Sequence, residues 1–467
     1  METLPDVSLL NNREKDEIIV ALWKQVQTLV AKVAELEGRL AKNSRNSNKP
    51  PSSDGFNKPN PKSLRHTGEK PSGGQIGHKG HTLKQVDEPD NIVVHAPPSN
   101  CDVCQRSLHN TTVAETRQVF DLPPLRYEVT EHQVMQVRCA CGKVHSGEFP
   151  KEVSSPVQYG PAVLAAVVHL THHHMLPVER TAALMGDLFH LPMSDATVIK
   201  ASKDARKHLG PTVAAIANAL QNAPILHADE TGMRVAKSLH WMHVLATGTL
   251  TWMARHAKRG KEAFDTLAIL PKFQGTLIHD GWKPYNELGC LHGLCNGHHL
   301  RELTYVFEDM QQTWAGSMIE LLVAACHEIS TAGTVLSKQR VDFFHHAYED
   351  LLVAGETLNP RVASSGKRGR AKQSKPTNLL TRLREKRDDV WRFMTDPGVP
   401  FTNNVAEQAI RMPKVKQKIS GGFRTENGAD TFCVIRSYLA TLHKQGANLF
   451  EALTQTFKGH PPQPRMV

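Results

Sequence analysis

The sequence predicts a multidomain α/β protein in which a sheet presents acidic side chains. Two short, mostly apolar stretches, 225–229 and 276–280, each end in an aspartate, Asp229 and Asp280. Such runs favour strands that deliver a carboxylate at their ends. A third acid, Glu407, follows a pair of asparagines at the predicted start of a helix. At 467 residues the chain is too long for a single hydrophobic core.

The elements around these acids follow an order known from other proteins. Residues 239–247 and 250–256 predict a hairpin joined at Gly248, residues 261–270 a helix, and then the second aspartate strand follows. Three strands, a helix and a fourth strand, with acids on the first and the fourth, is the order of a ribonuclease-H-like core. We therefore expect such a catalytic core here.

The core is expected to be interrupted by helices. No convincing strand follows Leu294, and residues 299–396 have a helical pattern. This predicts a large helical insertion between the first part of the core, 223–298, and its C-terminal part, 397–460. Within the insertion, residues 361–386 carry nine Lys or Arg and one acid, which predicts a basic loop that touches nucleic acid through Lys367, Arg368 and Arg370.

The three acids suit a metal site, although each also has a structural interpretation. Two aspartates on strands and a glutamate on a helix can hold two Mg²⁺ or Mn²⁺ ions about 4 Å apart. Alternatively, Asp229 is a turn residue, Asp280 forms a turn dipeptide with Gly281, and Glu407 completes a cap three residues after Asn404. Taken together, their order favours the metal site.

The N-terminal arm, residues 12–42, has a heptad seam. Its a positions are β-branched and its d positions are leucines, which favours a parallel two-stranded coiled coil and a homo-oligomer. The alternative is an amphipathic helix packed on the body of the same chain. The seam consists of Ile19, Leu22, Val26, Leu29, Val33, Leu36 and Leu40.

Residues 43–94 predict a Pro-, Gly- and Ser-rich basic linker. Across 42–84 there are nine Lys or Arg and two acids, so contact with a phosphate backbone is favoured over a plain solvated linker. The glycine-rich segment 73–81 allows a close approach to such a backbone. The candidate DNA-binding residues are Lys62, Arg65, Lys70 and Lys79.

Residues 95–150 predict a zinc-binding module. Two cysteine pairs, Cys101 with Cys104 and Cys139 with Cys141, bracket a segment from Val119 to Val137 that is rich in β-formers. Two such pairs can supply four thiolates to a structural Zn²⁺ ion, with His145 as an alternative ligand. Cys290, Cys295, Cys326 and Cys433 are expected to be buried small hydrophobes, although the first two could bind metal with His298 and His299.

Residues 160–222 predict a helical region. A helix over 177–189, a turn with Ser194 as a cap, and a helix over 195–206 match a helix-turn-helix outline. This pattern serves DNA contact or a scaffold equally well. If DNA binds here, Lys200, Lys203 and Arg206 are available for phosphates.

The composition and the N-terminal sequence argue against a membrane protein and against a secreted protein. Lys and Arg number 56 against 46 Asp and Glu, a net charge of +10 that favours a polyanionic partner. No apolar run reaches the ~18 residues of a membrane span. The charged N-terminal segment is not a signal peptide. Eight cysteines without an export signal favour metal or free thiols. We expect a soluble, cytoplasmic protein.

The ordered set of motifs resembles the DDE transposases of the insertion-sequence sixty-six family. It comprises the heptad arm, the segments Lys49–Asp54 and 73–80, the cysteine pairs, Asp229-Glu-Thr, Asp280-Gly and Asn404-x-x-Glu407, and it covers nearly the full length. The cysteine pair C-x-C and Trp282 after Asp280-Gly281 depart from the family pattern.

The resemblance implies a bacterial, nucleoid-associated enzyme that moves an insertion sequence. Asp229, Asp280 and Glu407 would hold two Mg²⁺ ions for cleavage and strand transfer of DNA at the element's ends, with Asp229 rather than Glu230 as ligand. His299 and Arg301 are further matching positions, and Arg411 and Lys414 belong to the basic run after the glutamate. Companion proteins encoded by the same element are also implied.

Two other functions fit the residues. A DNA-binding regulator would use the coiled coil, the zinc module and the helix-turn-helix without catalysis. A ribonuclease-H-like nuclease would cut DNA without joining it. The three acids argue against the regulator, and they do not separate a transposase from a nuclease.

Overall fold

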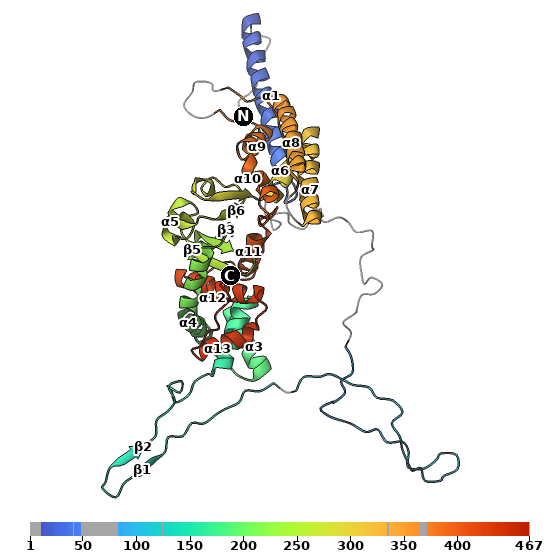
Figure 1. Ribbon diagram of the computed structural model, residues 1–467, viewed down its shortest axis with the longest axis vertical. Helices are drawn as coiled ribbons and strands as arrows, with labels where there is room; N and C mark the ends of the chain where they lie inside the picture. Colours follow the sequence, from blue (N-terminus) through green and yellow to red (C-terminus); the bar gives the residue numbers. More distant parts are fainter. Residues whose placement is uncertain are drawn as a thin grey trace.

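A five-stranded mixed sheet forms the centre of the computed structural model, which describes residues 11–40, 42–47, 83–123, 125–333, 336–363 and 371–466. The strand order is β5-β4-β3-β6-β7, and Figure 1 shows the sheet with β3, β5 and β6 labelled. The strands are β3 (Ile225–Val235), β4 (Ser238–Ala246), β5 (Thr251–His256), β6 (Thr276–His279) and β7 (Leu291–Leu294). The predicted hairpin and both strands are confirmed, but the first strand was expected to end at Asp229, whereas β3 continues to Val235 because it pairs with β4 over its whole length. The fifth strand, β7, was not predicted.

The register of the sheet brings the two aspartates together. Strand β3 pairs antiparallel with β4 and parallel with β6, where His227 lies opposite Ile278. Continuing that parallel register by two residues sets Asp229 beside Asp280. Asp229 lies within β3 and Asp280 directly follows β6, so the two acids come from neighbouring parallel strands at the same level of the sheet.

Helices cover both faces of the sheet. Alternate residues of a strand point to opposite faces, and here Leu226 and Ala228 pack with α4 (Asp195–Gln221) and α5 (Lys261–Leu267). Met233 and Val235 pack with α11 (Asn404–Ser420) and α12 (Glu426–Lys444) on the other face. The result is a three-layer arrangement with a mixed sheet in the middle.

The helical region before the sheet joins the C-terminal helices in one core. It contains α2 (Pro161–Val168), a π-helical turn η3 (His169–His173), α3 (Val178–Phe189) and α4. These pack against α12 and α13 (Leu449–Phe457) (Figure 1). Ser194 caps α4 as predicted, because its side chain accepts from the Thr197 amide at 3.3 Å. Helix α4 continues fifteen residues beyond the expected end at Arg206, to Gln221, with Pro211 inside it.

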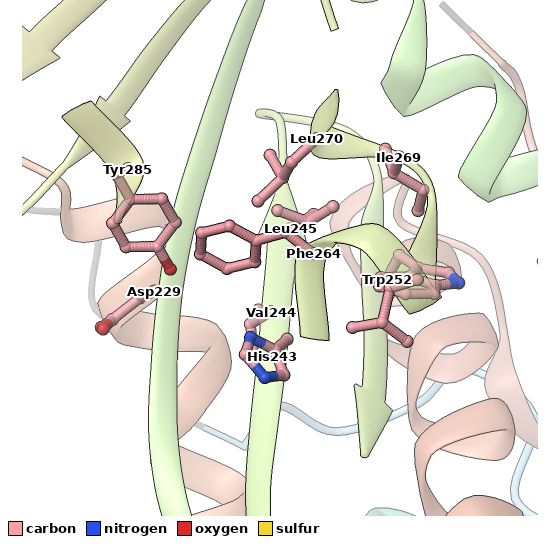
Figure 2. A pocket seen from close by; sticks show the side chains of 10 residues that line it. Asp229, His243, Val244, Leu245, Trp252, Phe264, Ile269, Leu270 and Tyr285 are labelled. Atoms are coloured by element: carbon pink, nitrogen blue, oxygen red, sulfur yellow. The ribbon is translucent and has the colours of Figure 1, made fainter. Parts of the chain in front are cut away.

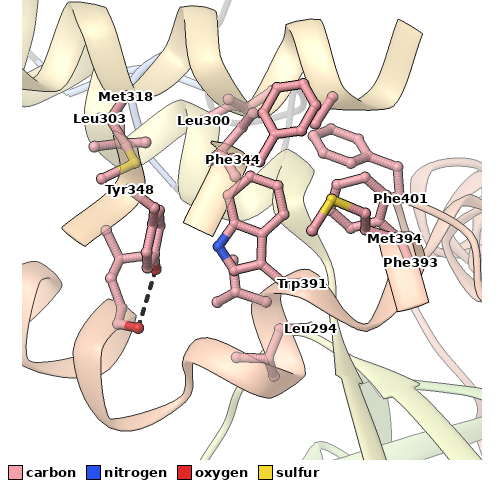
Figure 3. Packing of buried hydrophobic residues seen from close by; sticks show 14 of the residues in the cluster. Leu294, Leu300, Leu303, Met318, Phe344, Tyr348, Trp391, Phe393, Met394 and Phe401 are labelled. Atoms are coloured by element: carbon pink, nitrogen blue, oxygen red, sulfur yellow. Dashed lines mark hydrogen bonds between the residues drawn. The ribbon is translucent and has the colours of Figure 1, made fainter. Parts of the chain in front are cut away.

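Five helices lie between β7 and α11. No strand occurs among the described residues of this segment, as predicted. They are α6 (Asn296–Glu308), α7 (Thr313–Ala332), α8 (Lys338–Leu358), α9 (Lys375–Glu385) and α10 (Arg387–Thr395). Their core surrounds Trp391, which stacks on Phe393 and meets Tyr348 edge-on (Figure 3). The Tyr348 hydroxyl donates to the Leu383 carbonyl at 3.0 Å. Because Ile278 and Leu294 of the sheet belong to the same cluster, the helices and the sheet share a core.

The N-terminal arm forms the expected helix, α1 (Asn12–Leu40). Its seam residues are all exposed, for example Leu29 at 60% and Val33 at 52%. After the helix, Asn46 donates to the Asp309 carboxylate at 3.0 Å and Arg45 pairs with Glu308, so this segment is fastened to the end of α6. An apolar seam that the chain itself does not cover is a surface on which another helix can pack.

Residues 83–123 and 125–152 run as an extended trace apart from the helical body (Figure 1). The segment 119–137 was expected to be rich in strands, but only its end is paired, where β1 (Gln136–Arg138) meets β2 (Val144–Ser146). The linker residues Lys62, Arg65, Lys70 and Lys79 and the loop residues Lys367, Arg368 and Arg370 lie outside the described residues. Within the described part of the chain, no helix is long and apolar enough to cross a membrane.

Candidate functional site

The three acids singled out from the sequence come together at one edge of the sheet. Asp229 lies on β3, Asp280 directly follows β6, and Glu407 lies in the first turn of α11. All three side chains are partly buried. The Asp280 carboxylate accepts the Trp282 amide at 2.8 Å, so the predicted turn exists, yet its other oxygen is not used in that bond. The turn and a metal-binding role are therefore compatible.

The pKa of Asp229 responds to the neighbouring acids. Burial, followed by the neighbouring carboxylates of Glu230, Asp280 and Glu407, raises the pKa of Asp229 well above its ordinary value. Like charges held together disfavour ionisation of one another. A bound cation reverses this effect, because it favours the charged form of each acid. The cluster is thus unfavourable by itself and suited to a divalent cation.

Asn403 holds the glutamate helix against the aspartate strand. Its side-chain amide donates to the Ala228 carbonyl at 2.8 Å, and its side-chain oxygen lies 2.9 Å from the His227 ring. The residue is 1% exposed. It occupies the N-cap position of α11 but makes no side-chain cap bond there. Instead its side chain ties the first turn of α11 to the strand residues just before Asp229.

Cys295 connects the same tether to Glu407. Its sulfur accepts the Asn403 amide at 3.1 Å, and its thiol donates to the Glu407 carboxylate at 3.9 Å. Burial, and then Glu407, raise the pKa of this thiol to about 12, so it stays protonated. Cys295 was expected to be a buried small hydrophobe. Its burial is confirmed, but its contacts make it a positioning residue for Glu407.

Two side chains of α6 also face Glu407, a guanidinium and an imidazole whose pKa burial lowers. Arg301 and the His298 ring each lie 3.9 Å from the Glu407 carboxylate. His299, which the resemblance suggested, points instead into the core, where its ring meets the Asn296 side chain at 3.1 Å. The histidine at the acidic cluster is therefore His298. Cys295, His298 and Glu407 present potential ligand atoms within 4.8 Å of one another.

Glu230, which the sequence could not separate from Asp229, faces the other side of the strand. Its carboxylate pairs with Arg259 at 2.6 Å and accepts the Tyr285 hydroxyl. The Arg259 guanidinium lies over the rings of Trp282 at 4.0 Å and Trp241 at 4.8 Å. Glu230 is thus engaged in a buried ion pair, and Trp282, the departure from the family pattern, stacks on the arginine of that pair.

A small pocket lies beside Asp229 on the α5 side of the sheet (Figure 2). Its wall is mostly apolar, with Phe264 and Tyr285 stacked at 5.1 Å between ring centroids. Figure 2 shows the Tyr285 ring beside the strand, and its hydroxyl donates to Glu230, which faces the opposite side of the strand from Asp229. Tyr285 is 1% exposed, so the pocket braces the strand rather than offering polar groups to a ligand.

The donor set fits a hard divalent cation. Three carboxylates supply the oxygen ligands that Mg²⁺ and Mn²⁺ prefer. Besides burial, the charges of Asp280 and Glu407 contribute to the raised pKa of Asp229, as expected for carboxylates that share one site. The protonated Cys295 thiol adds a hydrogen bond to Glu407 rather than a soft ligand.

The other predicted DNA-binding residues lie at several places. Lys414 is partly buried on α11, and its ammonium lies 3.4 Å from the Gly232 carbonyl on β3. Arg411 is exposed on the same helix, and the ion-pair partners of Glu407 among the described residues are Arg301 and His298 instead. On α4, Lys203 is exposed, whereas Lys200 pairs with Asp204 and Arg206 contacts Asn427.

The four cysteines of the predicted zinc module lie in two separate turns. The backbone amide of Cys104 lowers the pKa of Cys101, and that of Cys141 lowers the pKa of Cys139. A lowered pKa favours the thiolate, the form that binds zinc. Among the described residues, the groups of three or more potential ligands within 4.8 Å do not include these cysteines, nor His145. The donor chemistry fits zinc, and the two pairs are apart in this structure.

A first prediction concerns Asp229→Asn. A raised pKa in the folded state means that folding retains a proton which the unfolded chain releases above about pH 4. The stability of the chelated protein should therefore fall as pH rises through the folded pKa. Asp229→Asn should remove this fall, so the variant should melt higher than the original protein at pH 8 and lose the Mg²⁺-induced rise in Tm.

Thermal melts with chelator and with Mg²⁺ at several pH values measure both effects. The exposed Asp265 on α5 provides the control, since Asp265→Asn makes the same charge change away from the cluster. Equal melting behaviour of the two variants would mean that Asp229 is not in a repulsive carboxylate cluster.

Comparisons with known families cover most of the chain. The Transposase IS66 family matches residues 156–431, more than half of the 467 residues. The zinc-finger binding domain of transposase IS66 matches residues 98–142, and a family of unknown function matches residues 2–84. The search of curated proteins gave no match. On the match over the sheet and its helices, the chain belongs to the IS66 family of transposases.

Proposed function

We propose that this transposase cleaves DNA at the ends of its element and joins the freed ends to target DNA, with Asp229, Asp280 and Glu407 as metal ligands. The single observation that carries the proposal is the convergence of these acids from β3, β6 and α11, where burial and then the neighbouring carboxylates raise the pKa of Asp229. A regulator without chemistry would have no reason to maintain such repulsion.

The sheet supports a ribonuclease-H-like core. Numbered within the sheet, its strands have the order 3-2-1-4-5, with the first three antiparallel and the last two parallel to the first. In our proposal 223–298 and 397–460 form this core around the insertion 299–396. Residues 160–222 serve chiefly as a scaffold, because α4 packs on the sheet and on α12.

In the proposed mechanism the metal ions supply positive charge and the protein positions the carboxylates. Two divalent ions, Mg²⁺ or Mn²⁺, would supply the charge that activates the attacking water or 3′-hydroxyl and steadies the leaving oxygen. The protein would hold the three carboxylates in place through Asn403 and Cys295. Arg301, beside Glu407, and Lys414, on the same helix, are available to a DNA phosphate that approaches the cluster.

The remaining parts are proposed to hold DNA and partner subunits. The basic linker 43–94 and the loop 361–386 would contact phosphates, in keeping with the net charge of +10. The zinc finger, within 95–150, would add a DNA-binding module stabilised by Zn²⁺. Residues 12–42 would form a coiled coil with a second copy, since the seam of α1 is exposed. Companion proteins of the element remain part of the proposal.

A nuclease that cuts without joining is the second candidate. It is favoured by the same acids, because cleavage and joining use one metal site. Supplying precleaved ends with a free 3′-hydroxyl separates the two functions, because only a transposase then joins them to target DNA.

The second prediction tests the catalytic proposal. Asp229→Asn, Asp280→Asn and Glu407→Gln should each reduce cleavage and joining by on the order of 10³-fold or more, while DNA binding survives. Double variants should lose little more than single ones, since ligands of one site act as a unit. Asn403→Ala should lose about 10–100-fold, because it loosens the helix that carries Glu407 without removing a ligand.

The measurement is a cleavage and strand-transfer assay on DNA bearing the element's ends, with companion proteins and Mg²⁺ or Mn²⁺ present. Asp265→Asn again serves as the charge-matched control and should keep activity. Wild-type cutting by Glu407→Gln would eliminate that residue from the site.

The third prediction concerns zinc. The purified chain should carry about one zinc ion in the finger, and Cys101→Ser or Cys139→Ser should lose it with faster hydrogen exchange over 95–150. Cys326→Ser on α7, a half-buried cysteine of the insertion, should keep the zinc. Elemental analysis gives the content, and zinc retained by the finger variants would rule out those thiolates as ligands.

The fourth prediction concerns self-association through the arm. Leu29→Glu with Leu36→Glu should weaken the oligomer, because unpaired charges would be buried in the seam. Glu35→Ala, which alters the arm outside the predicted seam, is the control. Sedimentation velocity measures both; an oligomer unchanged by the leucine substitutions would exclude the arm as the association element.

A further inference from the structure

Three histidines converge where helix α2 widens into a π-helical turn. The amide of His174 donates to the carbonyl of His169 at 3.2 Å, a bond that spans five residues. In an α-helix, residues four apart share a face, but residues five apart are turned well to the side. The i→i+5 turn brings both neighbours, His173 and His174, beside His169.

The three rings form a nearly equilateral group. Ring centroids are 4.9 Å apart for His169 and His173, 4.8 Å for His169 and His174, and 4.9 Å for His173 and His174. One ring nitrogen from each histidine lies within 4.8 Å of the others. Carboxylates play no part in this group, which distinguishes it chemically from the cluster around Asp229.

We propose that His169, His173 and His174 bind a divalent transition-metal ion such as Zn²⁺ or Ni²⁺. Imidazole suits these metals and does not suit Mg²⁺. An ion holds imidazole nitrogens at about 2.0–2.1 Å, so two ligands on one ion lie about 3–4 Å apart. Small side-chain rotations therefore bring the three nitrogens to ligand spacing, and water completes the coordination.

The surroundings separate this group from ordinary core histidines. The neighbouring His172 is buried, and its ring nitrogen meets the Ser202 hydroxyl at 2.9 Å, so it has a packing role. The other ring nitrogen of His172 has no hydrogen-bond partner among the described residues, and neither has the buried Nδ1 of His173, which belongs to the group of three. A metal ion would satisfy that nitrogen. His174 is exposed, so an ion can reach the group from solvent.

The protonation state of the group also suits a metal. Burial lowers the pKa of His169, and burial together with Arg436 lowers that of His173 to about 4. Both rings are then neutral near pH 7, which is the form of histidine that binds metal. His443 of α12 lies next to the group, 6.0 Å from His173 between ring centroids, so a bound ion would sit beside the end of α12.

The experiment uses the full chain without a polyhistidine tag, with the finger loaded with zinc and excess Mg²⁺ present to occupy the carboxylates. Isothermal titration with Ni²⁺ should show one site, and Ni²⁺ should raise the Tm. His174→Ala should weaken Ni²⁺ binding at least about 10-fold. Its exposed side chain makes the substitution harmless to folding, which circular dichroism verifies.

The matched control is His208→Ala, which removes an exposed histidine of α4. This variant should bind Ni²⁺ as the original protein does. Equal affinities of the His174 and His208 variants, or no Ni²⁺ site in the original protein, would overturn the proposal. Strand transfer is not a readout here, so this test and the test of the acidic site fail independently.

Discussion

The link between Asn403 and the strand residues before Asp229 is the constraint on which the site depends. The acids come from segments far apart in the chain, and the tether joins positions 175 residues apart, Asn403 and Ala228. Replacing a buried tether of this kind by an apolar residue would leave the Ala228 carbonyl and the His227 ring unpaired. The tether therefore both positions Glu407 and closes the sheet against α11.

The helical insertion contributes directly to the same site. It leaves the sheet at β7, and its first helix, α6, carries His298 and Arg301 to Glu407. Its last helix, α10, packs on β7, with Trp391 in a core shared with Ile278. An insertion anchored at both ends in this way returns the chain to Asn403, so it acts as a rigid brace for the glutamate helix.

Local sequence patterns predicted the elements that local forces determine. The hairpin, both aspartate strands and the Ser194 cap follow from alternation, turn residues and capping, whereas the predicted helix at Asn404 begins without a side-chain cap. Strand β7 was not predicted, because its four residues include a glycine and are too few to show a strand's alternation of apolar and polar side chains. The predicted end of α4 lay too early in the sequence, because tertiary packing stabilises the helix beyond that point in spite of Pro211. The roles of Asn403, Cys295 and His298 escaped because they arise from contacts between distant segments.

The carboxylate cluster and the buried ion pair next to it show how the strand serves two purposes. Asp229 and its neighbour Glu230 point to opposite faces, so one strand carries an uncompensated acid and a compensated one. Arg259 pairs with Glu230 and Tyr285 donates a hydrogen bond to it, and both pack with Trp282 on the face of β3 opposite to Asp229. The favourable contacts of Glu230 on one face of β3 thus offset the repulsion between the acids around Asp229 on the other face. The acids remain together, and a divalent cation can bind to them.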